Sequence, residues 1–272
     1  MSKISGVQTG YAGAGDVELY YETAGEGQSL VLLHAFVADN RLWDAQFSAF
    51  AQHYHVVRFD MRGFNNSSMS PEPFSYRRDL YELLNFLDIR QAHLLGSSMG
   101  GRVAMDFALE HPEMVRSLVL VAPEIGGNEP TGEPPSELLA FFQAMQQGEI
   151  DQAADLAVQI WLDGPNRTAG EVPAQIRSRM REMNVANMQN WAAVGREQPL
   201  EPPNIARLDE LVAPTLIIVG DQDYELNRTA ADLLAGKIAG AQKAIIAGTA
   251  HLPNLEKPAE FNKIVLDFLE GI

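Results

Sequence analysis

The most constraining feature of this chain is a series of short, almost continuously apolar runs that alternate with longer segments of helical character. Such runs are typical of strands buried on both faces, because a parallel sheet is covered by helices on both sides. They occur at residues 30–34, 55–59, 92–96, 117–123 and 214–220. The alternation predicts an α/β fold with a mostly parallel central sheet that helices flank.

Three of the intervening segments carry helix signals. Residues 75–89 begin at Ser75, which can cap a helix, and repeat leucine at a helical spacing. Residues 100–115 show a similar apolar spacing as far as Pro112, which cannot continue a helix. Residues 258–272 start with proline, which is favoured in a first helical turn. We expect this last helix to cover the end of the sheet.

The alternation of predicted strands and helices is interrupted between residues 125 and 211. A turn-rich stretch, GGNEPTGEPPSE, is followed by two segments with helical patterns, at 138–162 and 173–194, and no strand pattern separates them. An all-helical insertion in a parallel sheet is most simply a cap over its carboxyl edge. We therefore predict a single structural domain that consists of a core, residues 1–124 and 212–272, and a helical cap, residues 125–211.

The composition argues against several classes of function. The 272 residues contain 20 Lys and Arg against 36 Asp and Glu, and the net charge of −16 repels phosphate backbones and anionic membranes. The absence of cysteine excludes disulfides and a cysteine nucleophile. No apolar run approaches the roughly 18 residues of a membrane span, and the first residues lack a signal-peptide pattern. We expect a cytoplasmic monomer or homodimer that binds neither nucleic acid nor membrane.

The stretch LLGSSMGG lies where a predicted strand gives way to a predicted helix. It contains the pattern G-x-S-x-G, in which Gly96 and Gly100 flank Ser98. A serine at the tip of a sharp strand-to-helix turn projects its hydroxyl above the sheet, and small flanking residues avoid steric overlap. A plain Gly-Ser turn is the alternative. The position between strand and helix favours Ser98 as a nucleophile, with Ser97 pointing elsewhere.

A nucleophilic serine needs a base to take its proton and a group that orients the base. Of the six histidines, His251 lies on a loop between an apolar run and the last predicted helix. The only other histidine after Ser98 is His111, which falls at a helix end. Two acids, Asp221 and Asp223, follow the last predicted strand and are candidates for the orienting group. The residues thus supply the parts of a serine triad and leave the acid open.

Five stretches of the chain together resemble the α/β-hydrolase superfamily, in their order and in their spacing. They are LLHAFVADNRLWDAQF, RFDMRGFNNSS, LLGSSMGG, LIIVGDQDYEL and GTAHLPNLEKP, and they extend over nearly the whole chain. The resemblance implies an α/β-hydrolase fold and a triad in the chain order Ser, acid, His. The first stretch and the IWLDGP of the cap are similar to carboxylesterases and to the branch related to 3-oxoadipate enol-lactonase.

The resemblance also assigns roles to individual residues. In the family, a strand that ends in G-x-x-D places its acid last, which here is Asp223; a turn-capping role would explain Asp221. The oxyanion hole would be formed by the backbone N–H groups of Met99 and Phe36. Ala35 stands on this second loop where the family usually has glycine, and it fits there if its φ is negative.

The residues and the resemblance together predict a serine esterase that cleaves an ester or a lactone of a small molecule. Ser98 would form an acyl-enzyme, His251 would carry the proton and Asp223 would orient the imidazole, without a metal or an organic cofactor. In the superfamily that this chain resembles, hydrolytic dehalogenation uses a carboxylate as the nucleophile. A serine nucleophile therefore argues against that reaction. Two alternatives stay open: a ligand receptor that keeps the triad, and a cofactor-free C–C hydrolase or perhydrolase.

We expect apolar side chains near the triad and on the cap to line the substrate pocket. The candidates are Phe36, Trp161, Met183, Met188, Trp191 and Leu252. For each Met and Trp of the cap, packing against neighbouring helices is the alternative. Three arginines of the cap would favour an anionic substrate if they faced the pocket, but we expect a solvated helix face. They are Arg177, Arg179 and Arg181.

Overall fold

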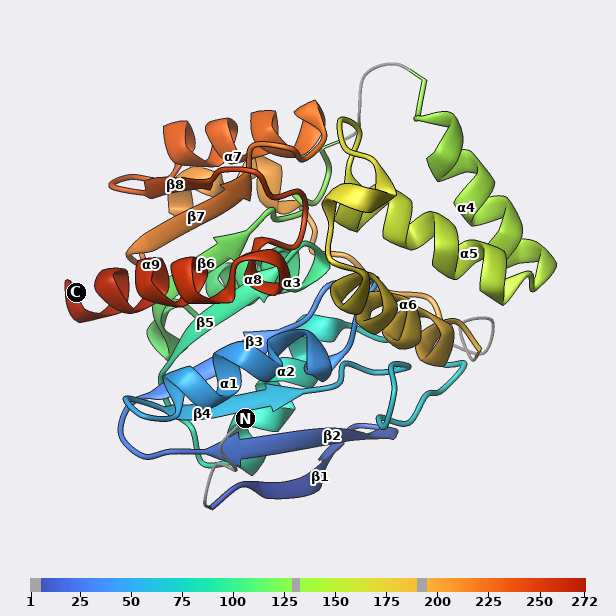
Figure 1. Cartoon of the computed structure of the whole chain (residues 1–272). Helices are drawn as coiled ribbons and strands as arrows, with labels where there is room; N and C mark the ends of the chain where they lie inside the picture. Colours follow the sequence, from blue (N-terminus) through green and yellow to red (C-terminus); the bar gives the residue numbers. More distant parts are fainter. Residues whose placement is uncertain (1–5, 129–132, 190–194) are drawn as a thin grey trace.

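A computed structural model describes residues 6–128, 133–189 and 195–272, and its strands form one eight-stranded sheet (Figure 1). The spatial order is β1-β2-β4-β3-β5-β6-β7-β8; β2 pairs antiparallel with β1 and β4, and the other neighbours are parallel. The strands are β1 (Gln8–Ala14), β2 (Val17–Ala24), β3 (Ser29–Leu33), β4 (His55–Phe59), β5 (Ala92–Ser97), β6 (Val115–Val121), β7 (Thr215–Gly220) and β8 (Gln242–Ile246). The predicted α/β class with a mostly parallel sheet is confirmed.

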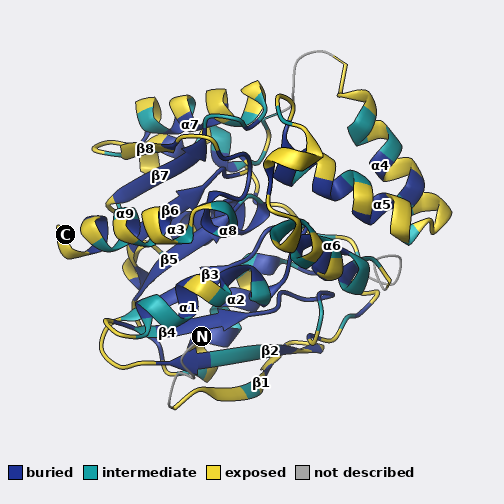
Figure 2. Cartoon of the chain, in the orientation of Figure 1, coloured by how far each residue is buried: buried dark blue, intermediate teal, exposed yellow. Residues whose placement is uncertain are grey.

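Helices lie on both faces of this sheet, and two apolar clusters hold them there. Side chains of α2, α3 and α7 pack in the first cluster, and side chains of α1 and α9 pack in the second. The helices are α1 (Asp44–Phe50), α2 (Tyr76–Phe86), α3 (Met99–Glu110), α4 (Ser136–Gln147), α5 (Ile150–Ala157), α6 (Ala174–Met188), α7 (Glu225–Lys237), α8 (Pro253–Glu256) and α9 (Pro258–Glu270), with a 3-10 turn η1 (Asn40–Trp43) and a π-helical turn η3 (Val158–Asp163). Figure 2 shows the central strands buried and the outer faces of α7 and α9 exposed.

The five apolar runs of the sequence are the parallel strands β3 to β7, whereas β1 and β8 were not predicted. Both unpredicted strands lie at the edges of the sheet, and β8 has only one fully buried residue. An edge strand that is mostly exposed lacks the long apolar run of a strand buried on both faces, and the apolar run before His251 gives β8 only three apolar residues, Ala244, Ile245 and Ile246. The helix that the sequence predicts to stop at Pro112 ends at Glu110, and a short turn at Pro112–Met114 leads directly into β6.

Residues 125–211, here called the insertion, separate β6 from β7. Figure 1 shows α4, α5 and α6 grouped at one side of the sheet, apart from α1 and α9, which run along its face. The described part of the insertion contributes no strand to the sheet; an isolated bridge joins Glu197 to Phe74. Its helices pack in the second apolar cluster, which they share with α1 and α9. Within the described residues, no helix has the length and apolar character needed to cross a membrane.

Two glycines allow the turn between β5 and α3 to pass close to the neighbouring backbone. A Cβ atom on Gly96 would overlap the carbonyl group of Gly100, and a Cβ atom on Gly100 would overlap the carbonyl oxygens of Leu33 and His34. The first turn of α3 therefore packs directly against the end of β3. This close approach brings the loop after β3 next to the residue that joins β5 to α3.

We predict that Gly100→Ala lowers the free energy of unfolding by about 1–3 kcal/mol, because the added methyl group overlaps backbone that cannot move easily. Gly236→Ala is the matched control, since Gly236 lies in α7 and a methyl group added there would meet open space. Alanine there is expected to be neutral or to stabilise by up to about 1 kcal/mol. Urea denaturation of both variants tests this, and an unchanged midpoint for Gly100→Ala would contradict the packing argument.

Candidate active site

Ser98 occupies the sharp turn between β5 and α3. Its backbone has φ 52° and ψ −114°, a conformation that costs a non-glycine residue about 1–3 kcal/mol. Three backbone hydrogen bonds hold it: Ser98 donates to Val121 at 2.9 Å, and its carbonyl accepts from Arg102 and Glu124, each at 3.1 Å. Ser97 is fully buried, whereas Ser98 lines a cavity. The two serines therefore point to different environments.

His251 and Asp223 meet at the carboxyl end of β7. The distance from His251 Nδ1 to Asp223 Oδ2 is 2.8 Å, and both residues are buried. An ionised carboxylate only accepts hydrogen bonds, so the proton of the imidazole lies on Nδ1 and Nε2 presents a lone pair. In the described residues Nε2 has no hydrogen-bond partner, and His251 lines the same cavity as Ser98. The imidazole is thus oriented as a base towards the space that Ser98 faces.

Asp221, the rival acid, has a different contact. Its carboxylate accepts the backbone N–H of Gly248 at 2.6 Å on an exposed part of the loop after β8. Asp223 instead accepts N–H groups on the oxygen that does not face the histidine, from Tyr224 N at 2.8 Å and from Asn227 Nδ2 at 2.7 Å. The structure brings Asp223, not Asp221, to His251.

Asn227 is a residue of the site that the sequence analysis missed. It lies in the first turn of α7, four residues after Asp223, and its amide nitrogen is 3.1 Å from His251 Nδ1 as well. Two donors, the amide and the imidazole, thus converge on one carboxylate. The spacing of four residues was the available signal, because a residue after a strand and one in the next helical turn can face each other.

The loop after β3, residues 34–38, carries the second predicted oxyanion donor and is here called the oxyanion loop. Phe36 lines the cavity with Ser98, and Met99 is the first residue of α3. Ala35 is not among the described non-glycine residues with positive φ, so alanine fits where glycine is usual. The Ala35 carbonyl accepts the Ala38 N–H at 3.0 Å, which closes a tight turn.

His34 anchors this loop to the core from within. It is fully buried; its Nδ1 is 2.9 Å from the Ala35 carbonyl oxygen, and its Nε2 accepts the Met61 N–H at 2.9 Å. These two partners require a neutral ring with the proton on Nδ1. Burial lowers the pKa of His34 to about 4. The ring therefore stays neutral through the physiological range and serves as a structural link.

The cavity around Ser98 has a volume of about 620 Å³, within the range of small-molecule sites. Of the predicted lining residues, Phe36 and Trp161 contribute to it. The described lining also includes residues that were not predicted, from the β6–α4 connection, α4 and α7: Ile125, Leu138, Phe142, Leu226 and Ala230. Apolar side chains from three parts of the chain therefore line the cavity that Ser98 and His251 share.

Other predicted lining residues lie elsewhere. Met183 and Leu252 have no exposed surface and are packed in the second apolar cluster, and neither is part of the described cavity lining. Met188 is partly buried against the same cluster. These three side chains face the core of the protein, so their contribution is packing. Trp191 lies outside the described residues.

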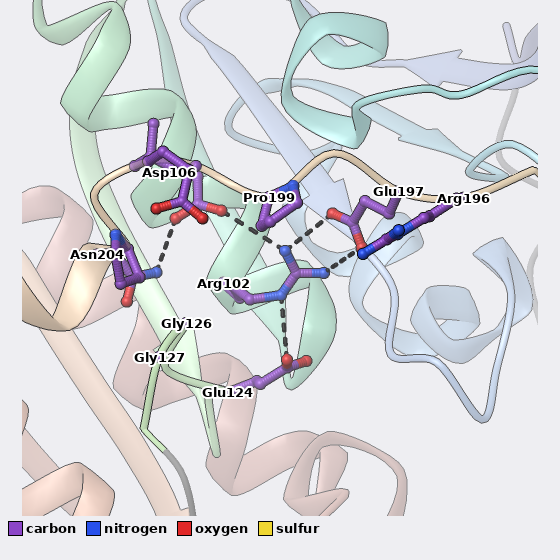
Figure 3. Close-up of a pocket in the computed structure, with 12 residues that line it drawn as sticks. Arg102, Asp106, Glu124, Gly126, Gly127, Arg196, Glu197, Pro199 and Asn204 are labelled. Carbon is purple, nitrogen blue, oxygen red and sulfur yellow. Dashed lines mark hydrogen bonds and ion pairs between the residues drawn. The ribbon is translucent and has the colours of Figure 1, made fainter.

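A second cavity, of about 460 Å³, adjoins the first and shares Glu124 and Gly127 with it (Figure 3). Its central side chain is Arg102, which is 7% exposed. The guanidinium donates to both carboxylate oxygens of Glu197 at 2.9 Å, and it forms an ion pair with Glu124 at 3.2 Å. The carboxylates around Arg102 thus already engage its charge.

The three arginines of the insertion also pair with acids of the protein. Arg177 forms an ion pair with Asp163, and Arg179 forms one with Asp44. Arg181 pairs with acids of α5, Asp151 and Asp155. None of the three lies in the described lining of the cavity around Ser98. Among the described residues, no group of three or more His, Asp or Glu is arranged to hold a metal ion.

The low pKa of His34 predicts how this residue contributes to stability as pH changes. Below its ordinary pKa of 6.5 the unfolded chain takes up a proton at His34, while the folded protein does so only near pH 4. Stability from a neutral His34 is therefore lost as pH falls from about 6.5 to 4, by roughly 3 kcal/mol in all.

We test this with His34→Gln, because the other titrating groups are common to both proteins. The stability advantage of the wild type over the variant, measured by urea denaturation, should shrink from pH 7 to pH 4.5. An advantage that stays constant or grows over this range would show that His34 is not held neutral. NMR of the ring nitrogens should independently report a proton on Nδ1 at pH 7.

Comparison with known proteins identifies the family of this chain. A family model described as the alpha/beta hydrolase fold matches residues 28–258. The 2-hydroxy-6-oxononadienedioate/2-hydroxy-6-oxononatrienedioate hydrolase of Paraburkholderia xenovorans is 28% identical over 94% of this chain and 92% of its own. The pimeloyl-[acyl-carrier protein] methyl ester esterase of Aeromonas hydrophila is 28% identical over 91% and 98%. The solved enol-lactonase of Burkholderia xenovorans superposes with a TM-score of 0.79 at 24% identity, over 96% and 100%. The chain therefore belongs to the α/β-hydrolase family, and its class of activity is hydrolysis.

Proposed function

We propose that the protein is a serine hydrolase that cleaves a carboxylic ester or a lactone of a small molecule through an acyl-enzyme. One observation carries the proposal: His251 Nδ1 is bound to the buried Asp223, while its Nε2 has no partner among the described residues in the cavity that Ser98 lines. A base with its lone pair directed into the nucleophile's cavity is what activation of a serine requires.

The first half of the reaction forms the acyl-enzyme. Ser98 Oγ attacks the acyl carbon, and its proton passes to His251 Nε2, so that the carbonyl oxygen becomes an oxyanion. The N–H groups of Met99 and Phe36 stabilise this oxyanion, each by about 3 kcal/mol as judged from single-donor deletions in other enzymes. The imidazolium, which Asp223 stabilises, then donates its proton to the departing alkoxide. In a lactone, the released alcohol stays attached to the acyl group.

The second half repeats these steps with water as the nucleophile. Water loses a proton to His251 as it attacks the ester carbon on Ser98, and the same two N–H groups hold the second oxyanion. Collapse of this intermediate breaks the bond to Ser98 Oγ, which recovers its proton from the imidazolium. The released products are an acid and a free enzyme. Every proton transfer in the cycle thus uses residues of this chain.

The cavity favours a neutral, largely apolar substrate. Its described lining contains apolar side chains, Asn227 and Asn128, and a single carboxylate, Glu124, and it contains no Lys or Arg. A free carboxylate elsewhere on the substrate would have to be buried there without a cation, and burial of an unpaired charge is costly. The buried guanidinium of the adjoining cavity, that of Arg102, is already paired with Glu197 and Glu124. These charges support monoesters and lactones over dicarboxylates.

We predict that Ser98→Ala and Asp223→Asn each lower kcat for p-nitrophenyl butyrate by about 10³-fold or more, because the triad acts as a unit. Asp221→Asn is the matched control and should change kcat by less than about threefold. A fluorophosphonate should label Ser98 in the wild type, located by mass spectrometry. A larger loss of kcat in Asp221→Asn than in Asp223→Asn would reassign the acid, and labelling without turnover on any ester would favour a ligand receptor.

Substrate charge gives a second prediction. The mono-p-nitrophenyl ester of glutaric acid, which carries one free carboxylate, should show kcat/KM at least tenfold lower than p-nitrophenyl butyrate. Glu124→Gln, which removes the negative charge of the lining, should narrow this ratio. Comparable kcat/KM values for both esters in the wild type would refute the argument from charge.

A further inference from the structure

We propose that Asn184 and Asn187 of α6 are positioning residues that orient the Phe36 N–H of the oxyanion hole. The insertion would then supply part of the catalytic framework in addition to covering the cavity. This inference rests on the proposed function, because an oxyanion hole has meaning only if Ser98 attacks an acyl group. It rests on hydrogen bonds between α6 and the oxyanion loop, which lie more than 140 residues apart in sequence.

Both asparagines donate to carbonyl groups of the oxyanion loop. Asn184 Nδ2 donates to the Val37 carbonyl oxygen at 2.8 Å, and Asn187 Nδ2 donates to the Ala38 carbonyl oxygen at 3.0 Å. Their exposed fractions are 1% and 5%, so water does not compete for these bonds. A spacing of three residues places both amides on the same side of α6. The helix thus holds two successive carbonyl groups of one loop.

Peptide planarity carries this constraint to Phe36. In a trans peptide, the C=O of one residue and the N–H of the next lie in one plane and point in opposite directions. When Asn184 fixes the Val37 carbonyl, it therefore fixes the Ala38 N–H. That N–H donates to the Ala35 carbonyl at 3.0 Å, and the Ala35 carbonyl shares its peptide plane with the Phe36 N–H. Asn184 thus sets the direction of the Phe36 N–H through two peptide units.

The other end of this relay is held by the core. His34 Nδ1, protonated as its two partners require, donates to the same Ala35 carbonyl at 2.9 Å. The carbonyl of the peptide that carries the Phe36 N–H is therefore held on one side by the His34 ring. On the other side it is held by the Ala38 N–H, which α6 fixes through the Val37 carbonyl. Asn187 adds a brace, because its Oδ1 accepts the Asn65 N–H at 3.0 Å on the loop after β4. Because Oδ1 must face the Asn65 N–H, Nδ2 is the end of the Asn187 amide that faces the Ala38 carbonyl.

The hydrogen bonding of Asn184 points to a role other than stability. Its Nδ2 has two acceptors, the Val37 and Met180 carbonyl groups, but its Oδ1 is buried without a hydrogen-bond partner in the described residues. A buried unsatisfied acceptor is unfavourable for folding, and an apolar side chain of similar shape would avoid it. The unsatisfied Oδ1 therefore offsets part of the stability that the Nδ2 hydrogen bonds contribute, which fits a donor whose role is to orient the loop.

The helix that bears these asparagines is firmly attached to the core. Met180 and Met183, on neighbouring positions of α6, are fully buried in the second apolar cluster. Arg179, on another face, forms an ion pair with Asp44 at the start of α1. α4 is different, since its Leu139 and Phe142 are about half exposed. α6 can thus serve as a fixed reference for the oxyanion loop while α4 borders the cavity.

The test compares Asn184→Leu and Asn187→Leu with Asn85→Leu, the same substitution on the exposed side of α2. A displaced donor acts on the oxyanion and not on the bound substrate, so kcat for p-nitrophenyl butyrate should fall about 10-fold to 50-fold while KM stays within about twofold. The affinity for a trifluoromethyl ketone, which forms an oxyanion on Ser98, should fall in proportion to kcat/KM. Asn85→Leu should match the wild type in all three quantities.

Two further measurements make each outcome decisive. Circular dichroism and the urea midpoint establish whether each variant is folded, and where a leucine variant does not fold, the alanine variant at the same position is compared in its place. Folded Asn184 and Asn187 variants with the kcat and ketone affinity of Asn85→Leu would overturn the inference, as would losses of kcat and of substrate binding by equal factors. The Ser98→Ala variant separates failure of this inference from failure of the proposed function. If Ser98→Ala retains turnover, the proposed serine mechanism itself is wrong.

Discussion

The arrangement of the site depends on the close backbone approach between β3 and the first turn of α3. Because Gly96 and Gly100 have no side chain, α3 can start within contact of the Leu33 and His34 carbonyl groups. The sheet order places β3 and β6 on either side of β5. The loop after β3 and the segment after β6 therefore both border Ser98. A bulkier turn would separate Ser98 from the loop that carries the Phe36 N–H.

The same approach explains how a strained residue is retained. Ser98 has a positive φ, and its N–H and C=O are both engaged by segments from neighbouring elements. Ala122, directly after β6, has a positive φ of 41° as well, and its N–H donates to the Ile218 carbonyl of β7. Both unfavourable conformations lie in the lining of the Ser98 cavity. Hydrogen bonds at the carboxyl ends of three adjacent strands offset this strain, as expected where function requires a fixed geometry.

The parts of this protein that could be predicted from sequence are those that a short, continuous stretch of residues marks by itself. The parallel strands are continuous apolar runs, and Ser98 has a motif of five residues with a strand before it and a helix after it. Asp223 needed a family resemblance, because two aspartates follow β7 and only their contacts separate them. Asn227 and His34 were missed since their roles depend on hydrogen bonds that no periodicity reveals.

In the insertion, predicting which residues line the cavity from their amino-acid type fails most clearly. Met183 was expected in the pocket because methionine is common in ligand sites, yet this side of α6 faces the apolar core. The neighbouring Asn184 and Asn187 are polar residues in a helix of low amphipathic character, so no apolar stripe in the sequence marked the face that they occupy. Their partners are backbone carbonyl groups far away in the chain. Such contacts have no signature in composition, because any residue can present a carbonyl.

The attachments of the insertion limit which of its parts can move relative to Ser98. Arg102 of α3 pairs with Glu197 of the insertion and with Glu124, the core residue directly before the insertion, so one guanidinium ties the insertion to the helix that follows Ser98. α6 is bound through Asn184 and Asn187 to the oxyanion loop. Rotation of the insertion as one body would break these hydrogen bonds together with the Arg102–Glu197 ion pair, which is largely buried on the Arg102 side. Access to the cavity is therefore expected to depend on α4, which contributes Leu138 and Phe142 to its lining and contributes no side chain to these attachments.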